Sequence, residues 1–258
     1  MRGSVLVVVV VVIAAGALAG LVYGAVNAIL VNPYLETAIE MENQAMFAAG
    51  LATDTAEFRA EYDSYREWQR GGQLLASAVL GAAFGSLFGV VFLFSERMLP
   101  GGSHMTKALA LAGIMWCAMY MVPFIKYPAN PPAVGDPETI LIRTLLYVAL
   151  VAASGLGALG AAKIYSHLAH GFGSRRAVCV AVTCYVSLVL VLYASLPSNP
   201  DPAPAIDQSL LDGFRAASAV GVTAFWISLG AIFGMFWHVG SPKVMGRLRK
   251  GSTFDSTD

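Results

Sequence analysis

Apolar and polar residues follow each other along this chain in long blocks. Six apolar blocks approach the roughly 20 residues that a helix needs to cross the hydrocarbon core of a bilayer. They cover about residues 5–31, 73–94, 108–125, 144–162, 177–196 and 216–237. This pattern predicts an all-α integral membrane protein with six transmembrane helices in a single polytopic domain. The first block stays uncharged for longer than the core of a cleaved signal peptide, so we expect it to remain as a span.

The polar blocks between the spans differ in length and character. Residues 32–70 form the longest of them, and a further polar tail covers residues 239–258. Within the long block, Glu36, Glu40 and either Asn43 or Gln44 recur at helical spacing, with Leu35 on another side. We therefore expect an amphipathic helical segment that lies at the membrane surface or against the bundle.

The remaining outer connections are rich in proline. The stretch 126–139 (KYPANPPAVGDPET) contains four prolines, and related turns occur at 32–33 and 197–202. Proline fixes φ and removes a main-chain donor, so such a stretch should be an ordered, extended link. Each following span is preceded by an acid and, seven, seven and eight residues later, by Arg70, Arg143 or Arg215. This recurrence predicts three parallel helical hairpins around an axis along the membrane normal.

Composition and charge agree with a membrane location. The chain of 258 residues is 57% hydrophobic and only 12% charged, about half the charged fraction of a soluble domain. The formal net charge is zero, which gives no attraction to nucleic acid. With the amino terminus inside, 10 of the 16 basic residues fall on cytoplasmic segments, as the positive-inside rule requires. We therefore expect both termini in the cytoplasm and the proline turns outside.

The sequence contains few residue types or spacings that predict a catalytic or ligand-binding site. No zinc-binding HExxH, phosphate loop, GxSxG or paired cysteine ligands are present, so we expect no enzyme and no resident cofactor. Asn27 is the deepest strongly polar group of the first span, where it either bonds another helix or lines a pathway. Arg70, Arg143 and Arg215 lie at the outer boundary, where they either pair with nearby acids or line the same pathway.

The outer segments resemble one known family. The stretch 126–139 with Arg143-Thr144, and to a lesser degree 68–73 (WQRGGQ) and the glycine-rich first span that runs into 32–33, are similar to the CbtA family of predicted cobalt transporter subunits. The family is usually described with five spans, one fewer than the pattern predicts here. The resemblance implies a membrane component for cobalt uptake in cells that make cobalamin. It also implies a small histidine-bearing membrane partner, CbtB.

The leading hypothesis is a six-helix bundle that helps to move a divalent cation, Co²⁺ in this family, from outside inward. The outer acids would raise its local concentration. Glu36, Glu40, Asn130, Asp136 and Glu138 would then bind it at the outer mouth, before it passes Asn27. The outer segment 32–70 contains no histidine, which leaves carboxylate and amide oxygens that select poorly for Co²⁺. The alternative is a non-transporting accessory subunit that docks onto a larger membrane complex in the lipid.

Overall fold

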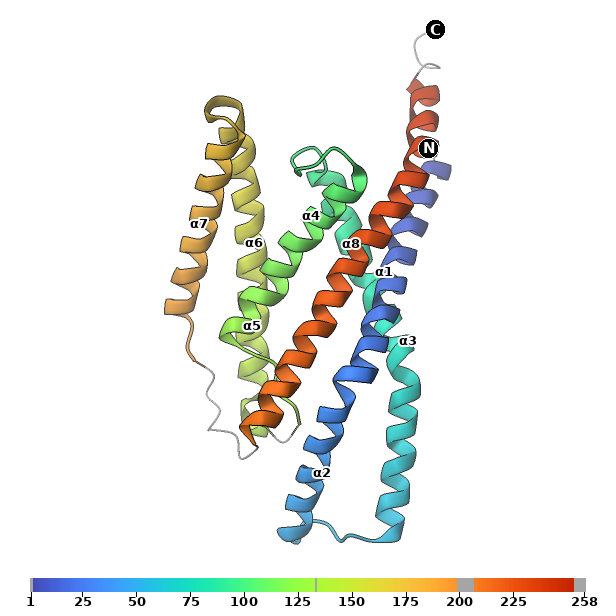
Figure 1. Cartoon of the computed structure of the whole chain (residues 1–258), viewed down its shortest axis with the longest axis vertical. Coiled ribbons are helices and arrows are strands. Elements are labelled where there is room, and N and C mark those ends of the chain that lie inside the picture. Colours follow the sequence, from blue (N-terminus) through green and yellow to red (C-terminus); the bar gives the residue numbers. More distant parts are fainter. Residues whose placement is uncertain (1, 133, 199–206, 253–258) are drawn as a thin grey trace. The chain divides into compact units, whose positions relative to one another are not determined.

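The computed structural model describes residues 2–132, 134–198 and 207–252, and every regular element among them is helical (Figure 1). The elements, listed in chain order, are α1 (Arg2–Leu30), α2 (Asn32–Ala48), α3 (Ala56–Ser95), α4 (His104–Trp116), the π-helix η1 (Cys117–Met121), α5 (Val122–Lys126), the 3-10 helix η2 (Pro137–Thr139), α6 (Ile140–Phe172), α7 (Ser174–Ser195) and α8 (Gln208–Ser252).

Within the described ranges, six helical stretches are long and apolar enough to cross a membrane, which confirms the six predicted spans. They are Leu6–Leu30, Ala56–Ser95, His104–Lys126, Ile140–Ala169, Ser174–Ser195 and Gln208–His238. The hairpin arrangement and the outer placement of the polar segments remain predictions.

The structure adds two details to the sequence pattern of the long polar block. Its second half is the beginning of α3, which starts at Ala56, where the Thr55 hydroxyl accepts a hydrogen bond from the Phe58 amide at 3.1 Å. Forty helical residues extend about 60 Å, twice the hydrocarbon thickness, so α3 projects beyond the membrane. In α2, Asn43 is buried together with Ala38, whereas Gln44 is exposed, so of the two alternatives Gln44 belongs to the exposed polar face.

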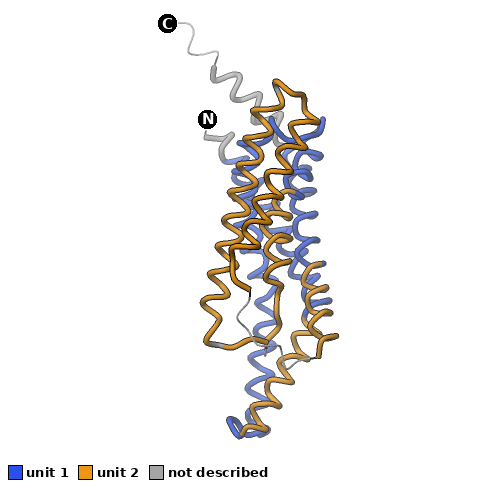
Figure 2. Tube along the Cα trace, turned by 90° about the vertical axis from the view of Figure 1, so that its left-hand side faces the viewer, with its two compact units in different colours: residues 1–31, 50–113, 220–258 blue, residues 32–49, 114–219 orange. Residues whose placement is uncertain are grey.

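The chain folds into two compact units (Figure 2). Unit 1 contains residues 1–31, 50–113 and 220–258, and unit 2 contains residues 32–49 and 114–219.

In unit 1, glycines bring α1 and α3 into main-chain contact. A Cβ added to Gly16 would overlap the main chain of Gly81 and Gly85, and one added to Gly81 would overlap Gly16 and Gly20. Lipid supplies no hydrophobic force between helices, so this close approach increases the dispersion contacts that hold them together.

An aromatic cluster joins α3 to α8 within unit 1. Phe88, Phe92 and Phe233 are fully buried, and the Phe233 ring meets each of the other two edge-on at a centroid distance of 5.0 Å. Edge-to-face rings add about 0.5–1.5 kcal/mol per pair beyond the apolar area that they bury.

In unit 2, hydroxyl groups support an irregular helix. The π-helix η1 is followed by Pro123, and the Tyr193 hydroxyl of α7 donates to the carbonyl oxygen of Val122 at 2.5 Å. Farther along the α6–α7 pair, the hydroxyls of Ser154 and Tyr185 lie 2.7 Å apart. Main-chain polar groups at membrane depth have no water to bond with. Side-chain hydroxyl groups that satisfy them therefore allow the backbone to depart from a regular α-helix.

The main-chain contact between α1 and α3, which we call the α1–α3 seam, can be tested with two glycines of α3, one inside the contact and one outside it. Gly81→Ala should lower the free energy of unfolding by about 1–3 kcal/mol, because the added methyl group pushes main chain against main chain. Gly72→Ala, where the methyl group meets open space, should leave stability unchanged or raise it by up to about 1 kcal/mol. Unfolding in detergent measures both; equal effects of the two substitutions would contradict the seam.

Candidate functional site

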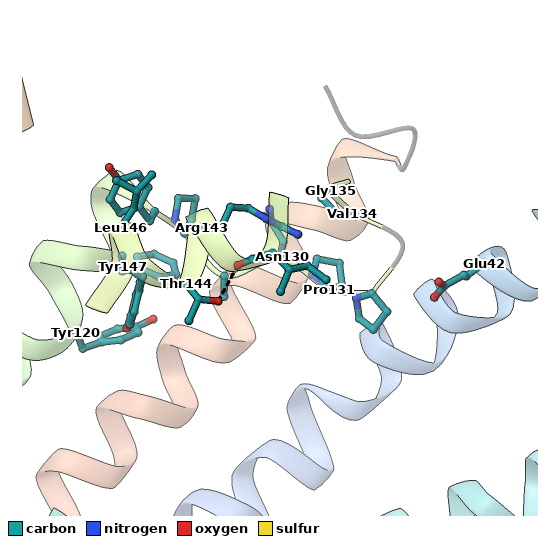
Figure 3. Close-up of a pocket in the computed structure, with 16 residues that line it drawn as sticks. Glu42, Tyr120, Asn130, Pro131, Val134, Gly135, Arg143, Thr144, Leu146 and Tyr147 are labelled. Atoms are coloured by element: carbon teal, nitrogen blue, oxygen red, sulfur yellow. Dashed lines mark hydrogen bonds between the residues drawn. The ribbon is translucent and has the colours of Figure 1, made fainter. Parts of the chain in front are cut away.

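A pocket of about 700 Å³ lies within unit 2, against the proline-rich segment (Figure 3). Sixteen residues line it, and ten of these belong to residues 127–135 or are Arg143 and Thr144. In Figure 3, α2 presents Glu42 at one end of the pocket, while Tyr120 and Tyr147 lie toward the other end. The segment that dominates the family resemblance therefore also forms most of the wall of this pocket.

The proline-rich segment is anchored at its first residues. Lys126 Nζ donates to the carbonyl oxygen of Tyr193 at 2.8 Å, and the Tyr127 hydroxyl donates to that of Pro197 at 2.7 Å. Loss of contact with water raises the pKa of Tyr127, so its hydroxyl keeps the proton that this bond needs. Both bonds tie the segment to the end of α7.

A third anchor comes from the start of α8. The Arg215 guanidinium donates to the side-chain oxygen of Asn130 at 2.8 Å and to the carbonyl oxygen of Ala129 at 3.2 Å. A hydrogen bond from a charged donor is stronger than a neutral one, so the bond to Asn130 holds the middle of the segment in place. The Asn130 oxygen, predicted as a metal ligand, accordingly has Arg215 as its hydrogen-bond donor.

Asp136 shapes the turn into α6. One of its carboxylate oxygens accepts the Glu138 amide at 2.9 Å, and its main-chain oxygen accepts the Thr139 amide at 3.0 Å. Arg143 Nη2 also lies 3.4 Å from that main-chain oxygen. The structure thus brings Asp136, Glu138 and Arg143 together around one turn, of which only Arg143 lines the pocket.

The other predicted metal ligands lie on α2. Glu36 is half-buried, whereas Glu40 is exposed and accepts a hydrogen bond from Gln44 at 3.1 Å. Neither lines the pocket, whose acid is Glu42. Sequence reasoning missed Glu42 because only the position of α2 beside the proline-rich segment distinguishes it from its acidic neighbours. The aromatic lining residues Tyr120 and Tyr147 were missed for the same reason.

The described part of the chain contains no group of three or more His, Cys, Asp or Glu side chains arranged to hold a metal ion. The pocket offers one carboxylate, from Glu42, and one guanidinium, from Arg143. A single carboxylate binds a divalent cation weakly, and a guanidinium nearby disfavours a bare cation. This arrangement suits brief contact with a hydrated ion rather than tight coordination.

The two remaining predicted pathway residues lie in unit 1. Arg70 is exposed on α3. Asn27 lies on α1 facing Gly221 of α8, where a Cβ would overlap its side-chain oxygen. That oxygen is buried and makes no hydrogen bond with any residue that the structure describes. A buried amide oxygen without a hydrogen-bond donor costs free energy in a membrane. A water that donates to this oxygen, or a passing cation that binds it, would offset that cost.

The bond between Asn130 and Arg215 can be measured with a double-mutant cycle. Asn130→Ala and Arg215→Gln should each destabilise the protein, with a coupling energy of about 1 kcal/mol because each removes the same charged hydrogen bond. Arg175→Gln, on an exposed side chain at the other end of α7, should combine additively with Asn130→Ala. Additive effects of Asn130→Ala and Arg215→Gln would contradict the anchor.

Comparison with known proteins gives one match. The family model described as "Probable cobalt transporter subunit (CbtA)" matches residues 6–238, which include all six spans. No curated protein and no solved structure matches the chain. The match confirms the resemblance seen in the sequence, which is strongest around the proline-rich segment and weaker in the last third of the chain. Because it covers most of the chain, the protein belongs to the CbtA family.

Proposed function

We propose that this chain is the membrane-spanning subunit of a cobalt uptake system and that it moves Co²⁺ inward. Family membership and the six spans give the coarse part of this statement, a multi-span subunit of the kind named for cobalt transport. The direction and the route are the proposal. The observation that supports them most strongly is that the stretch bearing the resemblance also walls the pocket in unit 2.

The first step of the proposed route is electrostatic. Glu36, Glu40, Asp136 and Glu138 belong to segments predicted to face outward, and their negative charges raise the local concentration of divalent cations. Not every outer acid contributes equally. The Arg59 guanidinium donates a hydrogen bond to the Asp54 carboxylate and thereby lowers the pKa of Asp54. The positive charge of Arg59 also offsets the negative charge of Asp54, so Asp54 attracts cations less than an unpaired acid does.

The second step takes the hydrated ion into the pocket at the Glu42 end. Arg143 repels the cation, so its position limits how deeply a bare ion can settle. In unit 1, Asn27 offers a buried amide oxygen within the first span, which we assign to a later step of the route. Weak, successive contacts of this kind permit passage, because an ion that is held too tightly does not leave.

Uptake into vesicles that contain only this protein tests the proposal. Glu36→Ala with Asp136→Ala should raise the Co²⁺ concentration needed for half-maximal uptake about two- to tenfold, because local enrichment of the ion is lost. Glu42→Gln should have a similar or larger effect. Glu57→Ala removes another exposed outer acid that does not line the pocket; it is the control for a general loss of negative charge and should have a smaller effect. Uptake that is insensitive to Glu36→Ala and Asp136→Ala would reject those two residues as part of the site.

One observation favours a second candidate, a non-transporting accessory subunit of a larger complex. The described residues hold no three-ligand group of metal-binding side chains, so this part of the chain offers few ligands to a metal ion. In that case other subunits supply the ligands for the metal ion. The proline-rich turns and the glycine-rich helix faces of this chain then contact those subunits.

Purification from native membranes in mild detergent distinguishes the two candidates. The transport proposal predicts co-purification with a small histidine-bearing membrane protein of the CbtB kind, and vesicles that hold both chains should then accumulate Co²⁺. Stable co-migration with an unrelated large complex, together with absence of uptake by the chain alone or with the small partner, would support the accessory role instead.

A further inference from the structure

Glu96 and His104 face each other across the connection between α3 and α4 in unit 1. Nδ1 of His104 lies 2.9 Å from Oε1 of Glu96, with the two side chains 30% and 25% exposed. The Nδ1 atom itself is buried and makes no hydrogen bond of good geometry within the described chain. A buried ring nitrogen and a carboxylate oxygen therefore meet between two side chains that are themselves still partly exposed to water.

The local main chain holds His104 in this position. Ser103 and Thr106 cap α4 reciprocally, with the Thr106 amide donating to the Ser103 hydroxyl at 3.1 Å and the Ser103 amide donating to the Thr106 hydroxyl at 3.2 Å. Gly101 has a φ of 123°, and a Cβ there would meet the Thr106 side chain. The turn thus presents the first residue of α4 in one orientation, which reduces the entropy lost when His104 binds a ligand.

Residues of α8 pack against residues near both Glu96 and His104 in the sequence of α3 and α4. Gly234 lies against Met105, the residue that follows His104, and the Trp237 ring lies 5.5 Å from that of Phe92, one turn before Glu96. The residues that flank Glu96 and His104 are therefore packed against α8, which limits the movement of the two side chains.

Imidazole nitrogen and carboxylate oxygen are donors that transition metals accept, and the 2.9 Å between them, which is also the length of an ordinary N–H···O hydrogen bond, is compatible with two adjacent ligands of one ion. Imidazole nitrogen with carboxylate oxygen suits Co²⁺, Ni²⁺ and Zn²⁺, whereas Mg²⁺ prefers oxygen donors alone. With metal–ligand bonds of about 2.1 Å at right angles, neighbouring donor atoms lie roughly 3.0 Å apart, which matches the distance between these two atoms. A simple ion pair between Glu96 and a protonated His104 is the alternative explanation for the contact.

We propose that Glu96 and His104 form a two-ligand site for a divalent first-row transition metal, with water completing the coordination shell. Two ligands give weak binding, as a transported ion requires if it is to be released. The predicted topology places this turn on the cytoplasmic side, so within the proposed transport function it is the point at which the ion leaves. Binding itself depends on neither the direction nor the occurrence of transport.

Co²⁺ binding to the purified, tag-free full chain in detergent tests the site. Titration followed by calorimetry and by the visible absorption of Co²⁺ should reveal one weak site, which a hundredfold excess of Mg²⁺ does not displace. His104→Asn and Glu96→Gln should each weaken binding by about tenfold or more. His167→Asn, on an exposed histidine of α6, is the matched control and should change the affinity by less than about twofold.

Two further measurements keep the test decisive. Each variant must elute like the unaltered protein, and if His104→Asn does not fold, Co²⁺ should instead protect His104 of the unaltered chain from diethylpyrocarbonate. Absence of Co²⁺ binding, absence of protection, displacement by Mg²⁺, or a His104→Asn variant that melts earlier with unchanged affinity would each overturn the site. Loss of uptake with Co²⁺ binding intact would instead count against the transport proposal.

Discussion

The constraint on which the structure depends is the absence of water around the main chain of the spans. Each amide and carbonyl group at membrane depth must find its partner within the protein, and helices meet this requirement within a single segment. In lipid the hydrophobic effect does not drive these helices together, because the surrounding acyl chains are as apolar as the side chains. Glycines on α1 and α3 allow main-chain contact, and buried phenylalanines between α3 and α8 fill the neighbouring space.

The same constraint explains the tyrosines and basic residues of unit 2. The π-helix η1, Pro123 and the proline-rich segment all depart from regular helix. Tyr193 and Lys126 bond to main-chain carbonyls around these departures, and Arg215 bonds to the middle of the segment. Without such anchors the pocket wall would be a loose loop, so we regard these residues as the support of the proposed ion mouth.

Sequence patterns predicted the spans because hydropathy reports directly on a helix in lipid. The sequence patterns predicted less about the bounds of polar segments and the roles of single polar residues, because tertiary contacts determine these. The polar residues before the second span looked like a separate segment, yet α3 runs through them from Ala56. Glu42 could not be distinguished from Glu40 until α2 was placed beside the proline-rich segment. Asn130 resembled a metal ligand by its chemistry, but only the fold shows that Arg215 donates to its oxygen.

The proposed inward route requires the proline-rich segment to face away from the cytoplasm. Ala129→Cys places a thiol on an exposed position of that segment, in a chain whose three native cysteines, Cys117, Cys179 and Cys184, have been replaced by serine. A membrane-impermeant maleimide added to intact cells or spheroplasts should label it at once. Labelling only after the membrane has been opened would place the pocket on the cytoplasmic side and contradict the proposed inward route.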